Sequence, residues 1–540
     1  MDEQNVLSVQ QVEAELSRGK AFKSTLGLYE QVKKNERFYI GEQWDGLKSA
    51  YIRPLTMNFM RRTCSYFQSM ILSDDIGYNI RPFADDAHGD EIASIYEHEI
   101  DRVFERTKLK QKNRDSLRDM IVDGDAVKYF FYDPDVPNGQ EISGEIKAEN
   151  LMNTNVIFGN PYSGEVQEQP YILIVRRRPV TSVRKEAKAA GVSDWESITS
   201  ENEGDYVGEE TGQSDTLCTE VTRFWKQNGR VWFAKFCGKV TLKQPTETAM
   251  TLYPISYMSW EERKNCYHGV SPMTEILNTQ IAVNQMWTAV NVFIQSAAFP
   301  KIVYNVNKFP NGWDGNPGRA VAVSGDVREA LTSVAGGVNL PNVIVQIMET
   351  IVSTTRDFMG ANDAALGNVR PDNTSAIIAV QKASSAPLEV KRLHFYQFIE
   401  DCVRIIVDMM GAYYGTRRVK AKVRVTGEDG AEHEDEQMLE FDFSAHELGS
   451  MEVNVDIGQA SYWSELIAVQ TADNLFTKGI YGDMAQYLDA LPDALIPNKS
   501  ALMREVRAKI ERNKQAQQLA QTQQTAQAPL PGMPEGMPQA

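Results

Sequence analysis

The sequence contains few cysteines and no motif that usually pairs them. Its five cysteines are scattered along 540 residues, and none of them forms a Cys-x-x-Cys pair. They are Cys64, Cys218, Cys237, Cys266 and Cys402. This spacing excludes a dense disulfide framework, argues against a structural zinc site and predicts a reducing compartment. The first residues, MDEQNVLSVQQVEAEL, are acidic and polar and do not predict a signal peptide.

The sequence also lacks the short motifs that mark common enzymes and cofactor sites. It has no GxxxxGK[ST], GxGxxG, HExxH or GxSxG segment and no pair of histidines at metal-ligand spacing. We therefore expect no cofactor, no metal and no catalytic residue. The turn acids Asp133 and Asp135 resemble a calcium loop, but the glycine of this turn falls one place too late. His268 lies near Cys266 and Ser271, and the start of a helix with Ser271 as its N-cap explains that group better.

Basic residues are scarce relative to acidic ones. The chain has 73 acidic and 56 basic residues, which gives a formal net charge of −17. A protein that holds double-stranded nucleic acid usually has a basic surface, because neutralised phosphates provide much of the affinity. The composition therefore disfavours tight DNA binding, although an acidic surface suits a protein that lets DNA pass without adhering.

Length and composition indicate a multidomain α+β protein. The chain is longer than one core usually supports, and its 42% hydrophobic and 24% charged residues are typical of globular proteins. Helical periodicity predicts helices over residues 8–37, with a break at Gly19/Lys20, and over residues 53–75 and 90–123. Alternating or extended patterns predict strands at 78–83, 126–133, 141–151, 171–180 and 221–242, the last with a hairpin turn at Asn228-Gly229.

Runs of one charge or of low complexity interrupt this pattern. Residues 194–215 contain many acids and no base, which predicts a solvated mobile loop. The basic run from Arg176 to Lys188 would suit a phosphate or an acidic neighbour, but it is more typical of a solvated sheet edge. The Gln- and Pro-rich residues 514–540 are predicted to be disordered.

Residues 271–301 form an unusual uncharged stretch. No charged residue occurs between Glu275 and Lys301, yet the stretch contains too many amides for a lipid environment. Its apolar residues recur at helical spacing and share one face, namely Ile276, Val283, Trp287, Val290 and Ile294. Asn284, Thr288, Asn291 and Gln295 form a polar stripe beside them. A helix without charge on any side is normally enclosed, either by its own chain or by neighbouring copies.

The uncharged stretch is followed by a small module and then by a second predicted helix, so that two helices flank the module. Residues 301–340 are rich in Gly, Pro and Asn, with strand patterns in KIVYNV and RAVAVSG, and a second helix is predicted over 341–359. A loop rich in helix breakers covers 361–375. A long helix then reaches Tyr414, with a kink expected at Pro387. Strands are predicted at 419–427, 438–443 and 451–458, and a helical segment at 459–513.

Several segments, taken in order, resemble the portal proteins, or head–tail connectors, of tailed bacteriophages. They are FYIGEQW, RPLTMNFMRRTCSYFQSMILSDD, DGDAVKYFFYDP, NVIFGNPYSGEVQEQPYILI, YHGVSPMTEILNTQIAVNQ and NTSAIIAVQKASSAPLEVKRLHFYQFIED. None of these segments is specific alone, but their shared order along most of the chain is.

The resemblance implies a multidomain portal fold assembled as a ring, typically a dodecamer, at one vertex of a capsid. Double-stranded DNA would enter through the ring during packaging and leave through it during ejection. The resemblance divides the chain into a wing (1–270 and 376–458, with the long kinked helix), two stem helices (271–299 and 341–359), a small β-containing clip (300–340), a tunnel loop (360–375), a helical crown (459–513) and a disordered tail (514–540).

The resemblance also implies which residues meet partners. The stem would pack against neighbouring copies through Ile276, Val283, Trp287, Val290 and Ile294. The tunnel loop would touch DNA through Asn368, Arg370, Asn373 and Thr374, although Arg370 suits a salt bridge to a neighbouring loop equally well. Phe309 and Trp313 would offer a partner surface on the clip, or else form its own small core.

The implied partners are further copies of the chain, double-stranded DNA, the major capsid protein, the terminase packaging motor and the tail adaptor, and none is a membrane. The expected location is the virion, after assembly in the host cytoplasm. The packaging ATPase must be another protein, because this chain has no phosphate-binding loop. Two alternatives stay open: a virion scaffold or adaptor that forms no ring, and an enzyme whose site, with His268 or Asp133, assembles only in space.

Overall fold

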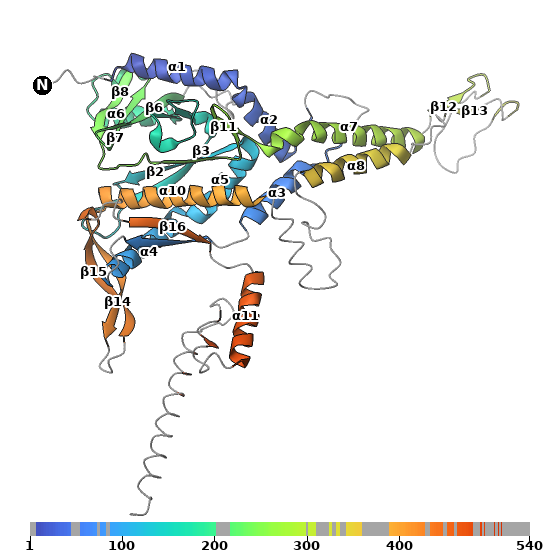
Figure 1. The fold of residues 1–540 in the computed structure, drawn as a ribbon. Coiled ribbons are helices and arrows are strands. Elements are labelled where there is room, and N and C mark those ends of the chain that lie inside the picture. The colour runs from blue at the N-terminus through green and yellow to red at the C-terminus, as the bar shows by residue number, and fades with distance from the viewer. Residues whose placement is uncertain are drawn as a thin grey trace, which may run out of the picture. The chain divides into compact units, whose positions relative to one another are not determined.

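The computed structural model divides the chain into two compact units, Met1–Asp456 and Ile457–Ala540. It describes residues 7–44, 54–72, 76–82, 87–200, 217–298, 301–308, 323–326, 331–334, 342–358, 388–426, 432–445, 451–457 and 462–478, and the single positions 487, 488, 491, 502, 506 and 509. The first unit mixes helices and strands, which confirms an α and β protein (Figure 1). The predicted tunnel loop, the kink at Pro387, most of the acidic loop and the tail lie outside the described residues.

The N-terminal region is helical, as predicted, but the turn between its first two helices does not lie where the sequence predicts it. Its helices are α1 (Val9–Thr25), α2 (Leu28–Ile40), α3 (Phe59–Ile71), α4 (Ala87–Thr107) and α5 (Leu109–Asp123). The predicted break at Gly19/Lys20 is wrong, because α1 continues and the chain turns at Gly27. Gly27 has a φ of +67°, a left-handed conformation that glycine adopts without strain. Gly19 provides space instead, because a Cβ there would lie 2.3 Å from Cγ2 of Ile157.

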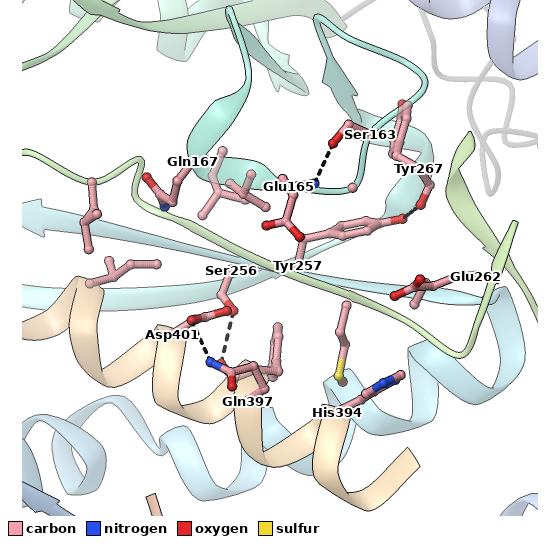
Figure 2. A pocket seen from close by; sticks show the side chains of 18 of the residues that line it. Ser163, Glu165, Gln167, Ser256, Tyr257, Glu262, Tyr267, His394, Gln397 and Asp401 are labelled. Atoms are coloured by element: carbon pink, nitrogen blue, oxygen red, sulfur yellow. Dashed lines mark hydrogen bonds between the residues drawn. The ribbon is translucent and has the colours of Figure 1, made fainter. Parts of the chain in front are cut away.

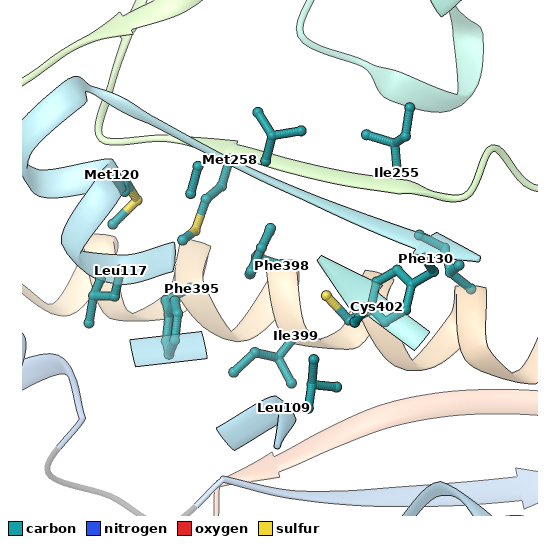
Figure 3. Packing of buried hydrophobic residues seen from close by; sticks show 14 of the residues in the cluster. Leu109, Leu117, Met120, Phe130, Ile255, Met258, Phe395, Phe398, Ile399 and Cys402 are labelled. Carbon is teal, nitrogen blue, oxygen red and sulfur yellow. The ribbon is translucent and has the colours of Figure 1, made fainter. Parts of the chain in front are cut away.

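A three-stranded antiparallel sheet and the long helix beside it form the main core. Its elements are β2 (Asp125–Asp133), β3 (Glu145–Leu151), β9 (Ile255–Ser259) and α10 (Glu389–Tyr413). The strand order is β3-β2-β9, and the pairing of β2 with β3 confirms the predicted hairpin. Figure 3 shows Phe398 and Cys402 of α10 beside Phe130 of β2, and each of these side chains is at most 1% exposed. The apolar face of helix α10, with its period of 3.6 residues, and the apolar face of strand β2, with its period of two, therefore pack into the same core.

A five-stranded antiparallel sheet carries the basic run. Its strands, in spatial order, are β4 (Val156–Phe158), β5 (Ile172–Pro179), β6 (Leu217–Gln227), β7 (Arg230–Cys237) and β8 (Val240–Glu247). Asn228 and Gly229 both have positive φ, which confirms the predicted turn between β6 and β7. β4 pairs with β5 only at Ile172, Leu173 and Ile174, so the basic residues of β5 lie beyond β4 and have β6 as their strand neighbour, as the sheet-edge interpretation predicts. Arg178 of that run pairs with Glu186 at 2.8 Å and with Glu220 at 2.5 Å within the chain.

Smaller elements connect these layers. They are β1 (Ile76–Pro82), η1 (Asn153–Asn155), α6 (Val180–Ala189), β10 (Glu261–Arg263), β11 (Cys266–Val270), α7 (Pro272–Ala298), β12 (Lys301–Tyr304), β13 (Leu331–Val334), α8 (Asn342–Phe358), β14 (Thr416–Thr426), β15 (Glu432–Asp442) and β16 (Met451–Ile457). β1 pairs with β16, β10 with β11, β12 with β13, and β14 with β15. In the second unit, α11 (Tyr462–Thr477) confirms a helix within the predicted helical segment.

A fully buried lysine attaches α1 to the segment around η1. Lys23 Nζ donates to three backbone carbonyls, those of Asn153 at 2.6 Å, Thr154 at 3.0 Å and Val156 at 2.6 Å. Burial lowers the pKa of Lys23 to about 7, and the nearby carboxylate of Asp125 acts in the opposite direction. The three protons of an ammonium group match the three carbonyls, so α1 and η1 are held together by one side chain.

We expect Lys23→Met to lower the free energy of unfolding by about 3 kcal/mol, because the three buried carbonyls lose their donor. Urea denaturation followed by circular dichroism measures the change. Arg18→Met, at an exposed position of the same helix, is the matched control and should change stability little.

The same lysine predicts a pH effect of defined sign. Its pKa is about 7 in the folded chain and 10.5 ordinarily, so between these values the unfolded chain binds one more proton. The stability of the wild type should therefore rise with pH across this window relative to that of Lys23→Met. Parallel pH–stability curves for the two proteins would contradict this assignment.

Candidate functional site

The uncharged helix α7 begins on the main core and leaves it with α8 at its side. Met273 N donates to Ser271 Oγ at 3.0 Å, which confirms Ser271 as the N-cap, and the same hydroxyl donates to Ile121 O at 2.7 Å. The first half of α7 packs against α2, α3 and α5, and α8 packs against α7. Figure 1 shows the two helices side by side between the core and the β12–β13 hairpin. A pair of strands, β12 and β13, therefore lies between the two helices in sequence, as predicted, and residues 319–322 of the second predicted strand lie outside the described residues.

Three polar side chains of α7 hold the extended segment that precedes α3. Thr288 Oγ1 accepts from Leu55 N at 3.0 Å, and Asn284 Oδ1 accepts from Met57 N at 3.0 Å. Gln280 accepts from Met60 N at 3.3 Å and donates to the carbonyl of Met57 at 2.7 Å. We call Gln280, Asn284 and Thr288 the amide ladder.

The amide ladder is buried, and the amide groups of Gln280 and Asn284 both donate and accept hydrogen bonds. Gln280 is 0% exposed and Asn284 2%. Asn284 Nδ2 also donates to Gln43 Oε1 at 2.5 Å, and Gln280 Nε2 donates to Asn284 Oδ1 at 3.0 Å. These bonds satisfy backbone groups of residues 55–60 that no strand partner satisfies. Asn284 and Thr288 belong to the polar stripe predicted from the sequence, but the segment that they bind was not predicted. The four-residue spacing of Gln280, Asn284 and Thr288 is the signal that could have indicated a shared partner.

The predicted apolar stripe of α7 divides into an inner and an outer part. Ile276, Val283 and Val290 are between 1% and 6% exposed within the single chain. Trp287 is half-buried, and Ile294 is 55% exposed. Of the five predicted packing residues, Trp287 and Ile294 are therefore the two left accessible to a neighbouring copy.

The second helix adds an apolar surface that the sequence analysis did not single out. Met348 of α8 is 1% exposed, whereas the adjacent Ile347 is 46% exposed. A groove of about 660 Å³ is lined by Met348 together with Met57, Trp287, Glu349 and Val352, among others, and Ile347 does not line it. We call the accessible apolar residues Trp287, Ile294 and Ile347, together with this groove, the outer face of the α7–α8 pair. Apolar surface of this kind is typical of an interaction site.

The remaining predicted contacts fall outside the described residues. These are Phe309 and Trp313 of the clip and Asn368, Arg370, Asn373 and Thr374 of the tunnel loop.

The His268 group is structural in its geometry. His268 Nδ1 lies 2.7 Å from Asp125 Oδ2, and Gly269 N donates to Asp125 Oδ1 at 2.7 Å. Burial would raise the pKa of Asp125, but His268 and the Gly269 amide outweigh it and hold that pKa below its ordinary value. Burial lowers the pKa of His268, which is 1% exposed. A histidine so enclosed offers no approach for a substrate.

The turn acids are also engaged within the chain. Asp133 pairs with Lys147 at 2.5 Å and accepts from Asp135 N at 3.2 Å. Among the described residues, no group of three His, Cys, Asp or Glu side chains is placed to hold a metal ion. No helix in the described part of the chain is both long enough and apolar enough to span a membrane.

A cavity of about 730 Å³ lies between the loop at residues 162–167, β9 and α10 (Figure 2). Glu165 and Asp401 line it from opposite sides, and burial raises the pKa of Asp401. Ser256 Oγ donates to Phe398 O at 3.1 Å, so its proton is already used. Burial also raises the pKa of Cys266, which disfavours the thiolate. Neither side chain is activated as a nucleophile.

We expect Asn284→Leu to lower the free energy of unfolding by about 2–3 kcal/mol, because Met57 N and the Gln43 and Gln280 side chains lose a partner. Hydrogen exchange at the Leu55 and Met57 amides should accelerate at the same time. Asn278→Leu, at an exposed position of α7, is the control. Unchanged exchange at Leu55 and Met57 in Asn284→Leu would contradict the role of the ladder.

Comparisons with protein-family models and with curated proteins do not assign the chain to a family. Neither protein-family models nor curated proteins give a match to the chain. Its function is therefore argued from its own residues.

Proposed function

We propose that this chain is the subunit of a bacteriophage portal, a ring-shaped channel at one capsid vertex through which double-stranded DNA is packaged and ejected. The observation that carries the proposal is the α7–α8 pair. Two adjacent helices bracket a short strand pair, and the first of them has no charged residue between Glu275 and Lys301. This agrees with the stem and clip that the sequence resemblance implies.

The outer face of the pair supports assembly into a ring. Ile294 and Ile347 are 55% and 46% exposed in the single chain, and Trp287 is half-buried beside an open groove. Burial of apolar surface releases about 25 cal/mol per Å², so a neighbouring copy that covered this face would be stabilised. A face that meets a different face on the next copy closes into a ring when the rotation allows it.

The charge of the chain supports a channel through which DNA slides. A net charge of −17 repels the phosphate backbone, and salt limits that repulsion to about 8 Å under physiological conditions. The proposed contacts of the tunnel loop, including Arg370, would touch the DNA only transiently. In this proposal the clip at 300–340 engages the terminase motor and later the tail adaptor, while the wing meets the major capsid protein in the virion.

The double variant Ile294→Lys/Ile347→Lys should abolish rings without unfolding the chain, because both side chains already contact water in the single chain. Light scattering gives the mass of the assembly, and electron micrographs of the purified protein show whether it is a closed ring. Met152→Lys makes the same change at a residue that is 44% exposed and lies outside the pair, and it should leave rings intact.

The same two measurements on the wild-type protein test the proposed function itself. A monomeric or dimeric wild-type protein would contradict the portal proposal. Normal rings from the double variant would keep the ring but remove the outer face from its interface.

A further inference from the structure

Strand β9 is an edge strand of the three-stranded sheet. Within the described part of the chain the strand order is β3-β2-β9, with no strand beyond β9. Just before β9, Phe130 N donates to Pro254 O at 2.9 Å, and just after it Trp260 N donates to Gly124 O at 2.9 Å. The bonds of an antiparallel pair alternate along each strand, so the even-numbered residues of β9 direct their backbone groups to β2.

The odd-numbered residues of β9 therefore direct their backbone N–H and C=O groups away from β2. Ile255 is 0% exposed, whereas Tyr257 and Ser259 are partly exposed. Among the described residues, none forms a hydrogen bond with the backbone N–H or C=O of Tyr257 or Ser259 on that side. A strand edge with unpaired backbone groups can accept another strand. We call these backbone groups of Tyr257 and Ser259 the open edge of β9.

The cavity of about 730 Å³ lies against this open edge, and all residues of β9 line it. Figure 2 shows the loop with Glu165 on one side of β9 and α10 with Asp401 on the other. Even-numbered side chains of β9 face α10, as the bond from Ser256 Oγ to Phe398 O shows. The volume is within the range of about 300–1,000 Å³ that is usual for ligand sites. A strand placed in the cavity would continue the sheet, with α10 on one face and the loop on the other.

Both walls of the cavity carry a carboxylate beside the open edge. Glu165 belongs to the loop and Asp401 to α10. Burial raises the pKa of Asp401, and the carboxylates of Glu400 and Glu165 add to this rise, whereas Gln397 and Arg404 oppose it. Arg404 lies 3.8 Å from Asp401 but pairs with Glu400. A cationic side chain between the two walls would therefore be stabilised.

The other charged or titratable side chains that line the cavity do not reverse this sign. They are Glu262 and Arg263 of β10 and His394 of α10. Glu262 and Arg263 have opposite charges, and His394 is formally neutral at pH 7. The occupant that suits the cavity is thus extended in its backbone and basic in its side chains.

We propose that the open edge of β9 binds an extended peptide segment of a partner protein that carries two adjacent basic residues. The main chain of the segment pairs with Tyr257 and Ser259, which is strand addition to a sheet edge. Successive side chains of a strand point to opposite faces, so one basic residue meets Glu165 and the next meets Asp401. The inference goes beyond the proposed function and does not depend on ring formation, because one chain supplies every wall of the site.

Binding of a labelled, blocked hexapeptide, Thr-Val-Lys-Lys-Val-Thr, to the full chain tests this site. We expect saturable binding by fluorescence anisotropy, and slower hydrogen exchange over residues 255–259 by mass spectrometry, because the added strand covers the open edge. A peptide with glutamates in place of both lysines should bind about tenfold more weakly or not at all. Methylation of the backbone nitrogens of both lysines removes a donor from each edge of the peptide and should abolish binding.

Matched variants of the protein test the two walls. Glu165→Gln/Asp401→Asn should weaken binding of the dilysine peptide by about tenfold. Glu168→Gln/Glu389→Gln removes two carboxylates from neighbouring positions of the loop and of α10 that do not line the cavity, and it should bind like the wild type. Thermal unfolding followed by circular dichroism confirms that both variants are folded.

Four results would each overturn the proposal. They are no saturable binding of the dilysine peptide, equal binding of its methylated form, unchanged exchange over residues 255–259 in the complex, and equal affinity of Glu165→Gln/Asp401→Asn and the wild type.

Discussion

Hydrogen bonding inside an uncharged helix is the constraint on which the α7–α8 pair depends. Between Glu275 and Lys301 the helix has no charge with which to bind water or a counter-ion. Its buried amides must therefore find neutral partners, and the backbone ahead of α3 supplies them at Leu55, Met57 and Met60. Each unmade bond would cost about 1–3 kcal/mol. The conformation of α7 and that of the segment ahead of α3 therefore depend on each other, because each supplies the hydrogen-bond partners of the other.

This use of the amides changes which residues remain for assembly. The resemblance assigned one apolar stripe to contacts between copies, yet Ile276, Val283 and Val290 are buried by their own chain. What faces outward is the far end of the stripe at Ile294, together with Ile347 from the second helix. An interface built from these residues would require both helices, because Ile294 belongs to α7 and Ile347 to α8.

Sequence patterns predicted those features that local chemistry determines. Asn228-Gly229 specifies a tight turn because both residues tolerate positive φ, and Ser271 caps a helix because its hydroxyl accepts an early N–H. Patterns failed where a distant partner decides. Gly19 accommodates Ile157 rather than a break, and Arg176 and Arg178 of β5 form ion pairs with glutamates of other strands, which the basic run alone does not identify. The partners of the amide ladder lie more than 200 residues away in sequence, beyond any periodicity.

Electrostatics limits which surfaces of this acidic chain can join copies in the proposed ring. Each copy has a net charge of −17, so bringing copies together is opposed unless the facing surfaces avoid like charge. Salt confines the repulsion to about 8 Å, so local pattern matters more than net charge. In the α7–α8 pair, α7 has no charge between Glu275 and Lys301, whereas α8 contributes Glu349 to the groove. The uncharged surface of α7 is therefore the part of the pair that a second acidic copy could approach with least repulsion.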